Sequence, residues 1–125
     1  MNQVRNGLGL PSLYLDSALN SIAQAHSADM VARNFFSHVN PSGLTPTNRA
    51  TAAGFNYPVG ENIAMATTLL AIHTNLMNSP GHYANTIKTD WTRAGVGIAY
   101  KSNGYIYVTI MFSVRDLVLY PVTAA

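Results

Sequence analysis

The sequence predicts an α+β fold, a three-layer α-β-α sandwich in which helices cover both faces of a small, mostly antiparallel sheet. The first observation behind this prediction is Asn103-Gly104, the dipeptide most typical of a β-hairpin, between two apolar segments at residues 93–100 and 105–112. The second is that both faces of this hairpin are apolar, so both have to be covered. The third is the helical spacing of apolar residues in several other segments, which can supply the two covering layers.

The length and composition predict one domain. The chain has 125 residues, of which 48% are hydrophobic and only 10% are charged, and it is long enough to bury a real core. We expect a single domain over residues 1–125, with residues 1–14 an irregular lead-in and residues 114–125 a C-terminal extension. The formal net charge is +2 and no cluster of Lys and Arg occurs, so nucleic acid is not expected as a partner.

Missing sequence features narrow the possible chemistry. The chain has no cysteine, which excludes disulfides, thiol catalysis and Cys-ligated zinc. No apolar run approaches the ~20 residues that a membrane-spanning helix needs, so no transmembrane segment is expected. The first residues lack the apolar core of a signal peptide, which fits either a cytosolic protein or a mature domain cut from a longer precursor.

A long helix is predicted from Asp16, a preferred N-cap residue, to about Asn34. His26 lies on its apolar face, where a buried histidine with a hydrogen-bond partner is more common than a metal ligand. His38 follows this helix closely, at the start of a turn sequence over residues 39–43. Because loops held by rigid elements commonly carry function, His38 is a candidate functional residue.

A second, short helix is predicted over about residues 46–53, with Thr45 before its first-turn proline. Arg49 is one of few charges there and is a candidate to anchor the neighbouring loop. Residues 56–64 read as an extended segment that contains Glu61. Glu61 has mostly small and apolar neighbours, and a carboxylate in such a setting needs a cation or hydrogen-bond donors. Glu61 is therefore a second candidate functional residue.

Two further helices are predicted between the extended segment and the hairpin. The first covers residues 69–77, is capped by Thr67 or Thr68, and has almost no polar stripe. Such a helix either packs on more than one side or presents an apolar patch, and packing is the more common outcome. In the second, Ser79 can cap the helix and His82 stands in the first turn. His82 is either polar surface or a functional imidazole.

The hairpin itself carries a specific prediction of register. A two-residue loop at the Asn-Gly dipeptide would pair Tyr100 with Tyr107. In that register Gly95 and Gly97 share a face with the even-numbered residues of the second strand, from 106 to 112. The two glycines leave room for a helix or a ligand to approach the sheet closely.

Several short segments of the chain together resemble the CAP superfamily of cysteine-rich secretory proteins, antigen 5 and plant pathogenesis-related proteins, and in particular its cysteine-free bacterial, SCP-like branch. The matching segments are Ala25-His26-Ser27-Ala28-Asp29-Met30, Phe36-Ser37-His38, Pro41-Ser42-Gly43, Ala53-Gly54-Phe55, Gly60-Glu61-Asn62-Ile63-Ala64, Asn78-Ser79-Pro80-Gly81-His82 and Ala94-Gly95-Val96-Gly97-Ile98-Ala99. They occur in order over roughly residues 8–113. The resemblance implies an α-β-α sandwich, in agreement with the hairpin argument.

The resemblance also implies a surface cleft that holds two histidines and one or two glutamates. By motif these residues correspond to His38, Glu61 and His82, and the cleft is expected to include Ser37, Asn62 and Ser79 as well. Some relatives bind Zn²⁺ or another divalent cation there, so the three residues His38, Glu61 and His82 are the implied metal ligands. Ser79 stands where many relatives have the second glutamate, which weakens the metal interpretation.

Two functions from different classes follow from the resemblance. The first is a secreted or cell-surface binding module for a sterol, a fatty acid or a protein, with the signal peptide already removed. The apolar segment at residues 69–77 favours it and could also form a weak dimer of an otherwise monomeric protein. The alternative is a metal-dependent hydrolase or protease in which Glu61 acts as the base on a metal-bound water. We favour the binding module and assign no enzymatic activity; a scaffold domain and a Ser-His-Glu triad from Ser37 or Ser79 are weaker alternatives.

Overall fold

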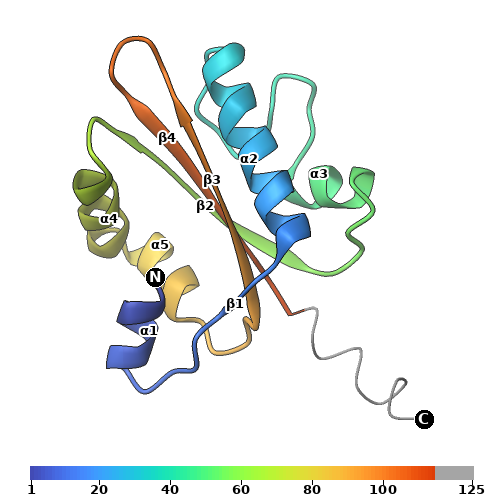
Figure 1. The fold of residues 1–125 in the computed structure, drawn as a ribbon. Helices are drawn as coiled ribbons and strands as arrows, with labels where there is room; N and C mark the ends of the chain where they lie inside the picture. Colours follow the sequence, from blue (N-terminus) through green and yellow to red (C-terminus); the bar gives the residue numbers. More distant parts are fainter. Residues whose placement is uncertain (115–125) are drawn as a thin grey trace.

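The computed structural model describes residues 1–114 and has the predicted α-β-α sandwich around one four-stranded sheet (Figure 1). Its elements are α1 (Asn2–Gly7), β1 (Tyr14–Leu15), α2 (Ser17–Ala32), α3 (Pro46–Ala52), β2 (Val59–Ala66), α4 (Leu69–Asn78), α5 (Pro80–Ile87), β3 (Arg93–Tyr100) and β4 (Ile106–Ser113). The strand order is β1-β3-β4-β2, and only the short β1–β3 pair is parallel. Helices α2 and α3 lie on one face of the sheet and α1, α4 and α5 on the other (Figure 1).

Local capping signals fix where the helices begin. The Asp16 carboxylate accepts hydrogen bonds from the N–H groups of Ala18 and Leu19, as expected of an N-cap. Thr45 and Asn48 form a reciprocal capping box at the start of α3. Thr68, rather than Thr67, caps α4. In the part of the chain that the structure describes, no helix is both long and apolar enough to cross a bilayer.

The predicted irregular lead-in at residues 1–14 is wrong, because α1 and the first residue of β1 lie within it. A six-residue helix has little stability of its own, so tertiary contacts have to hold it. Arg5 supplies them: its side chain is buried and donates hydrogen bonds to the carbonyl oxygens of Pro11, Thr86 and Lys88. Thr86 and Lys88 belong to the end of α5 and the residue after it, which the local sequence around Arg5 gives no means of predicting. The predicted C-terminal extension lies outside the described residues, except for Val114.

The hairpin is where the sequence predicts it, but its register is shifted by one residue. Tyr100 pairs with Ile106, and the Lys101 N–H donates to the Tyr105 carbonyl across a three-residue loop. A two-residue type I′ loop needs a positive φ at both central residues, and of the two only Gly104 has one, with φ 94°. Because side chains alternate along a strand, the shift places Gly95 and Gly97 opposite Met111 and Thr109, not beside the even-numbered residues.

Helix α2 packs with its backbone directly against β3. A Cβ atom added at Gly95 would lie 2.2 Å from the Leu19 carbonyl carbon, and one added at Gly97 would lie 2.2 Å from the Gln24 nitrogen. The helix also satisfies the outer edge of β3 beyond its short pairing with β1. The Val96 N–H donates to Asn20 Oδ1, and Gln24 exchanges hydrogen bonds with both backbone groups of Ile98. Residues four apart on the helix therefore match residues two apart on the strand.

Helix α4 is packed on one side and open on the other. Ile72 and Leu76 are buried in the core formed with the sheet. Leu69 is 51% exposed, Leu70 is 75% exposed, and His73 is also exposed. Helix α4 therefore packs against the core and also presents an apolar patch. The patch lies at the N-terminus of the helix.

Candidate functional site

A surface cavity of about 300 Å³ brings together most of the residues singled out in the sequence. We call it the β2 cleft. Its lining residues come from the loop after α2, from β2, and from the start of α5; they are His38, Glu61, Asn62, Ser79, Gly81, His82 and Asn85. Five of the six predicted cleft residues therefore meet in one place.

Strand β2 positions two of these residues by its alternation. Glu61 and Asn62 are consecutive, so their side chains leave opposite faces of the sheet. Glu61 turns toward α3, and Asn62 turns toward α5, where its amide donates to the His82 carbonyl and accepts from Asn85. Both residues are buried, and the hydrogen bonds of Asn62 tie the start of α5 to the strand.

The Glu61 carboxylate is held by Arg49, which the sequence predicts only as a loop anchor. Arg49 Nη2 lies 3.0 Å from Oε1 and 2.8 Å from Oε2 of Glu61, and it also donates to the His38 carbonyl oxygen. The His38 ring joins the same group, with Nδ1 2.8 Å from Oε1. The side chain of Glu61 is 1% exposed and that of Arg49 is 10% exposed, so the ion pair is buried. A buried carboxylate needs a cation, and in the folded loop Arg49 is that cation.

Both cleft histidines are oriented through the same ring nitrogen. His38 Nδ1 contacts Glu61, and His82 Nδ1 lies 2.7 Å from the Ser79 hydroxyl. Ser79 occupies the N-cap position of α5, but its hydroxyl pairs with His82 and does not cap the helix. Within residues 1–114, no hydrogen bond engages Nε2 of either histidine. The two rings are therefore fixed in orientation, and each keeps one nitrogen for a ligand.

Ser37 is the predicted cleft residue that the structure places elsewhere. It is not among the residues that line the β2 cleft. Its hydroxyl accepts from the Val39 N–H, and its carbonyl oxygen lies 2.8 Å from Nε2 of His26. The second contact gives the buried His26 ring the hydrogen-bond partner that was predicted for it.

The cleft residues do not fit the three-ligand metal centre that the resemblance implies. Both carboxylate oxygens of Glu61 are already bound by Arg49, and one of them also by His38. Among the side chains that the structure describes, no group of three His, Asp or Glu residues is arranged to hold a metal ion. In this arrangement Glu61 neutralises Arg49 and orients His38.

An apolar pocket of about 200 Å³ adjoins the β2 cleft, and we call it the side pocket. Its lining residues are mostly apolar and come from β2, α4, the loop after α2 and the start of α5; they are Phe36, Ile63, Ala64, Met65, Asn75, Leu76, Ser79 and His82. Ser79 and His82 line both cavities. The polar β2 cleft and the apolar side pocket therefore share a wall.

Solved structures and curated proteins resemble this chain over most of its length. An extracellular protein containing a SCP domain from Bacillus anthracis str. Ames superimposes with a TM-score of 0.81 and 32% identity, over 90% of this chain and 37% of that one. An outer surface protein from Borrelia burgdorferi superimposes with a TM-score of 0.83 over 90% of this chain and 84% of that one, and its 21% identity supports the fold alone. Protein YkwD of Bacillus subtilis (strain 168) is 35% identical over 108 residues, which are 85% of this chain and 41% of YkwD.

The Bacillus subtilis membrane protein YlbC is 32% identical over 99 residues, which are 78% of this chain and 29% of YlbC. The chain thus spans less than half the length of these two curated relatives. The CAP family, described as the cysteine-rich secretory protein family, matches residues 1–112. With this match, the sandwich fold and the cleft residues in place, the chain belongs to the cysteine-rich secretory protein (CAP) family.

Proposed function

We propose that this domain is a secreted or cell-surface binding module that holds an amphipathic lipid, a fatty acid or a sterol, in the β2 cleft and the side pocket. The observation that carries the proposal is the wall that the two cavities share. A ligand can place its polar end beside His38 and His82 and its apolar part against Phe36, Ile63 and Leu76. Ligand sites of this kind are mostly apolar, with a few polar groups that fix orientation.

The charges of the β2 cleft agree with a polar but uncharged end or a single carboxylate. Arg49 neutralises Glu61, so the cleft does not present a free anion that would repel a carboxylate. The remaining lining groups are the two imidazoles, the Ser79 hydroxyl and the Asn62 and Asn85 amides. All of them can donate or accept a hydrogen bond. Extracellular placement is proposed because a 32% identical relative is an extracellular protein.

Dodecanoate binding, measured by calorimetry, tests the proposal. Phe36→Ala removes part of the side-pocket wall, since Phe36 is 45% exposed and still has area for a ligand to cover. We expect this variant to bind dodecanoate about fivefold more weakly or worse. The control is Leu70→Ala, which removes an equally apolar and 75% exposed side chain that lines neither cavity. Equal losses in the two variants, or no binding of dodecanoate and of cholesterol sulfate by the parent domain, would rule the lipid proposal out.

A divalent cation is the second candidate occupant of the β2 cleft. One observation favours it, namely that His38 and His82 each have Nδ1 engaged and Nε2 available, as metal-binding histidines do. Two imidazoles are fewer protein ligands than structural or catalytic zinc sites use. We therefore expect no saturable zinc binding at micromolar concentration in a chelator-free titration. Saturable binding that disappears in both His38→Ala and His82→Ala would instead favour the metal-dependent alternative.

A further inference from the structure

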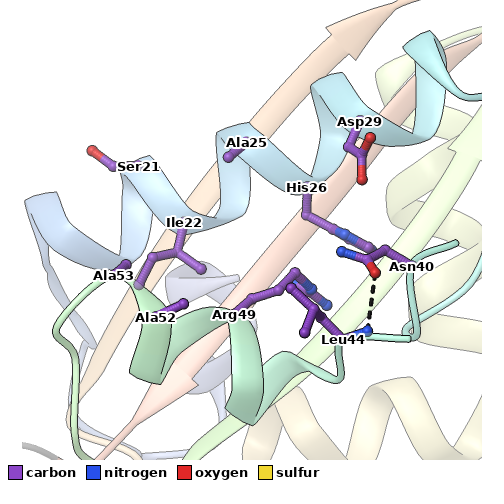
Figure 2. Close-up of a pocket in the computed structure, with 10 residues that line it drawn as sticks. All are labelled: Ser21, Ile22, Ala25, His26, Asp29, Asn40, Leu44, Arg49, Ala52 and Ala53. Atoms are coloured by element: carbon purple, nitrogen blue, oxygen red, sulfur yellow. Dashed lines mark hydrogen bonds between the residues drawn. The ribbon is translucent and has the colours of Figure 1, made fainter. Parts of the chain in front are cut away.

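A third cavity, of about 500 Å³, lies between α2 and α3 (Figure 2). We call it the α2–α3 cavity. It is lined by Ser21, Ile22, Ala25, His26, Asp29, Asn40, Leu44, Arg49, Ala52 and Ala53, none of which lines the β2 cleft. Its size is that of a site for a small organic molecule. Most of its wall is aliphatic, with contributions from both helices and from the turn that carries Leu44.

Two polar side chains of this cavity carry buried atoms that have no partner. His26 is 1% exposed, and its Nδ1 makes no hydrogen bond to any part of the chain that the structure describes. The same holds for Nε and Nη1 of Arg49, whose side chain is 10% exposed. His26 extends from α2 and Arg49 from α3 toward the turn that carries Asn40 (Figure 2). Buried polar atoms in native proteins are almost always satisfied, so these three atoms indicate a missing partner.

The roles of these atoms follow from their other contacts. His26 Nε2 faces the Ser37 carbonyl oxygen, which can only accept, so Nε2 carries the ring proton. In the neutral ring Nδ1 is then an acceptor. Burial lowers the pKa of His26, and the positive charge of Arg49 acts in the same direction, which favours the neutral ring. Arg49 Nε and Nη1 are donors. A single group that bound both side chains would therefore have to donate one hydrogen bond and accept at least one.

We propose that the α2–α3 cavity binds a small apolar alcohol, whose hydroxyl donates to Nδ1 of His26 and accepts from the guanidinium of Arg49. A hydroxyl is the simple group that does both. A carboxylate has no proton to give to His26, and an ammonium group would meet the charge of Arg49. An ordered water molecule is the competing occupant, and it would leave the aliphatic wall formed by Ile22, Leu44 and Ala52 uncovered. The absence of saturable binding of an alcohol would favour the water. This site is independent of the lipid proposal, because it uses a different cavity.

The test is an NMR titration of the ¹⁵N-labelled domain with cyclohexanol, with methylcyclohexane as the probe of similar shape that lacks the hydroxyl. We expect saturable shifts of the amides of Ile22 and Ala52 and of the His26 ring nitrogens on addition of cyclohexanol. Methylcyclohexane should bind about tenfold more weakly or worse, because it leaves the buried donor and acceptor atoms unsatisfied. A stronger or equal affinity for methylcyclohexane would overturn the proposal, as would the absence of saturable shifts with cyclohexanol.

A matched pair of variants distinguishes binding in the α2–α3 cavity from nonspecific binding elsewhere on the domain. Ala25→Leu places a larger side chain in the wall at an exposed helical position, so the fold should tolerate it while the cavity is filled. Ala28→Leu makes the same change at an exposed position of α2 that does not line the cavity. Cyclohexanol binding should be lost in the first variant and kept in the second. Equal behaviour of the two variants would contradict the assignment.

Discussion

Replacing Gly97 by Ala is expected to lower the free energy of unfolding of this domain by about 3 kcal/mol or more. The added Cβ atom would lie 2.2 Å from the backbone nitrogen of Gln24 and 2.3 Å from the carbonyl carbon of Ala23, and neither atom can move without shifting α2. The Ser27 hydroxyl also donates to the Gly97 carbonyl, so a shift of the helix would break a buried hydrogen bond. Urea unfolding followed by circular dichroism measures the change.

Gly7→Ala is the control for this substitution. Gly7 is the last residue of α1, its φ is not positive, and a Cβ atom added there meets nothing within 4 Å. Alanine should therefore be neutral or should stabilise the domain by a few tenths of a kcal/mol, roughly, through the unfolded chain. A loss of less than about 1 kcal/mol in Gly97→Ala would show that α2 does not pack against β3 as described.

Glu61→Ala is expected to have the second largest effect, a loss of about 3 kcal/mol in the free energy of unfolding. The substitution leaves the guanidinium of Arg49 buried without its carboxylate and removes the hydrogen bond to His38. Arg49→Ala should cost a similar amount, because it leaves Glu61 buried and unpaired. In the double variant the two losses should not add, since each single change removes the same interaction.

Two control variants test whether the loss of stability is specific to the Arg49–Glu61 pair or follows any substitution in the domain. Asp29→Asn weakens the ion pair with Arg33 on the outside of α2, and the free energy of unfolding should hardly change. His82→Ala removes a cleft side chain that is only half-buried, and it should cost less than about 1 kcal/mol. Losses in Glu61→Ala no larger than in these variants would mean that the Arg49–Glu61 pair does not organise the β2 cleft.

The parts of the fold that the sequence predicts correctly are those with a local cause. Asp16 caps α2 by accepting from the N–H groups two and three residues further on, and Thr45 caps α3 by accepting from the N–H group three residues further on. The hairpin position follows from Asn103-Gly104, but its register depends on whether Asn103 takes a positive φ, which the dipeptide permits and does not require. Helix α1 depends on the contact of Arg5 with carbonyl groups more than 80 residues away, for which there is no local signal.

The candidate site also combines features that the local sequence predicts with features that depend on distant contacts. The motifs identify His38, Glu61 and His82, and the structure places them around one cavity. The role of Glu61 depends on Arg49, which reaches it only after the loop between α2 and α3 is folded, and composition gives no means of pairing one arginine with one acid. The α2–α3 cavity could not be predicted either, because a cavity arises where side chains fail to fill space, and the sequence records only their sizes and polarity.

The histidine ring signals of the domain offer the most direct test of the proposed lipid site. The chain has four histidines, of which His38 and His82 line the β2 cleft, while His73 is exposed on α4 and lines neither the cleft nor the side pocket. During a titration with dodecanoate below its micelle concentration, the ring signals of His38 and His82 should shift together with one dissociation constant, and those of His73 should stay in place. Unchanged signals of His38 and His82, or equal shifts of His73, would contradict a lipid site in the β2 cleft.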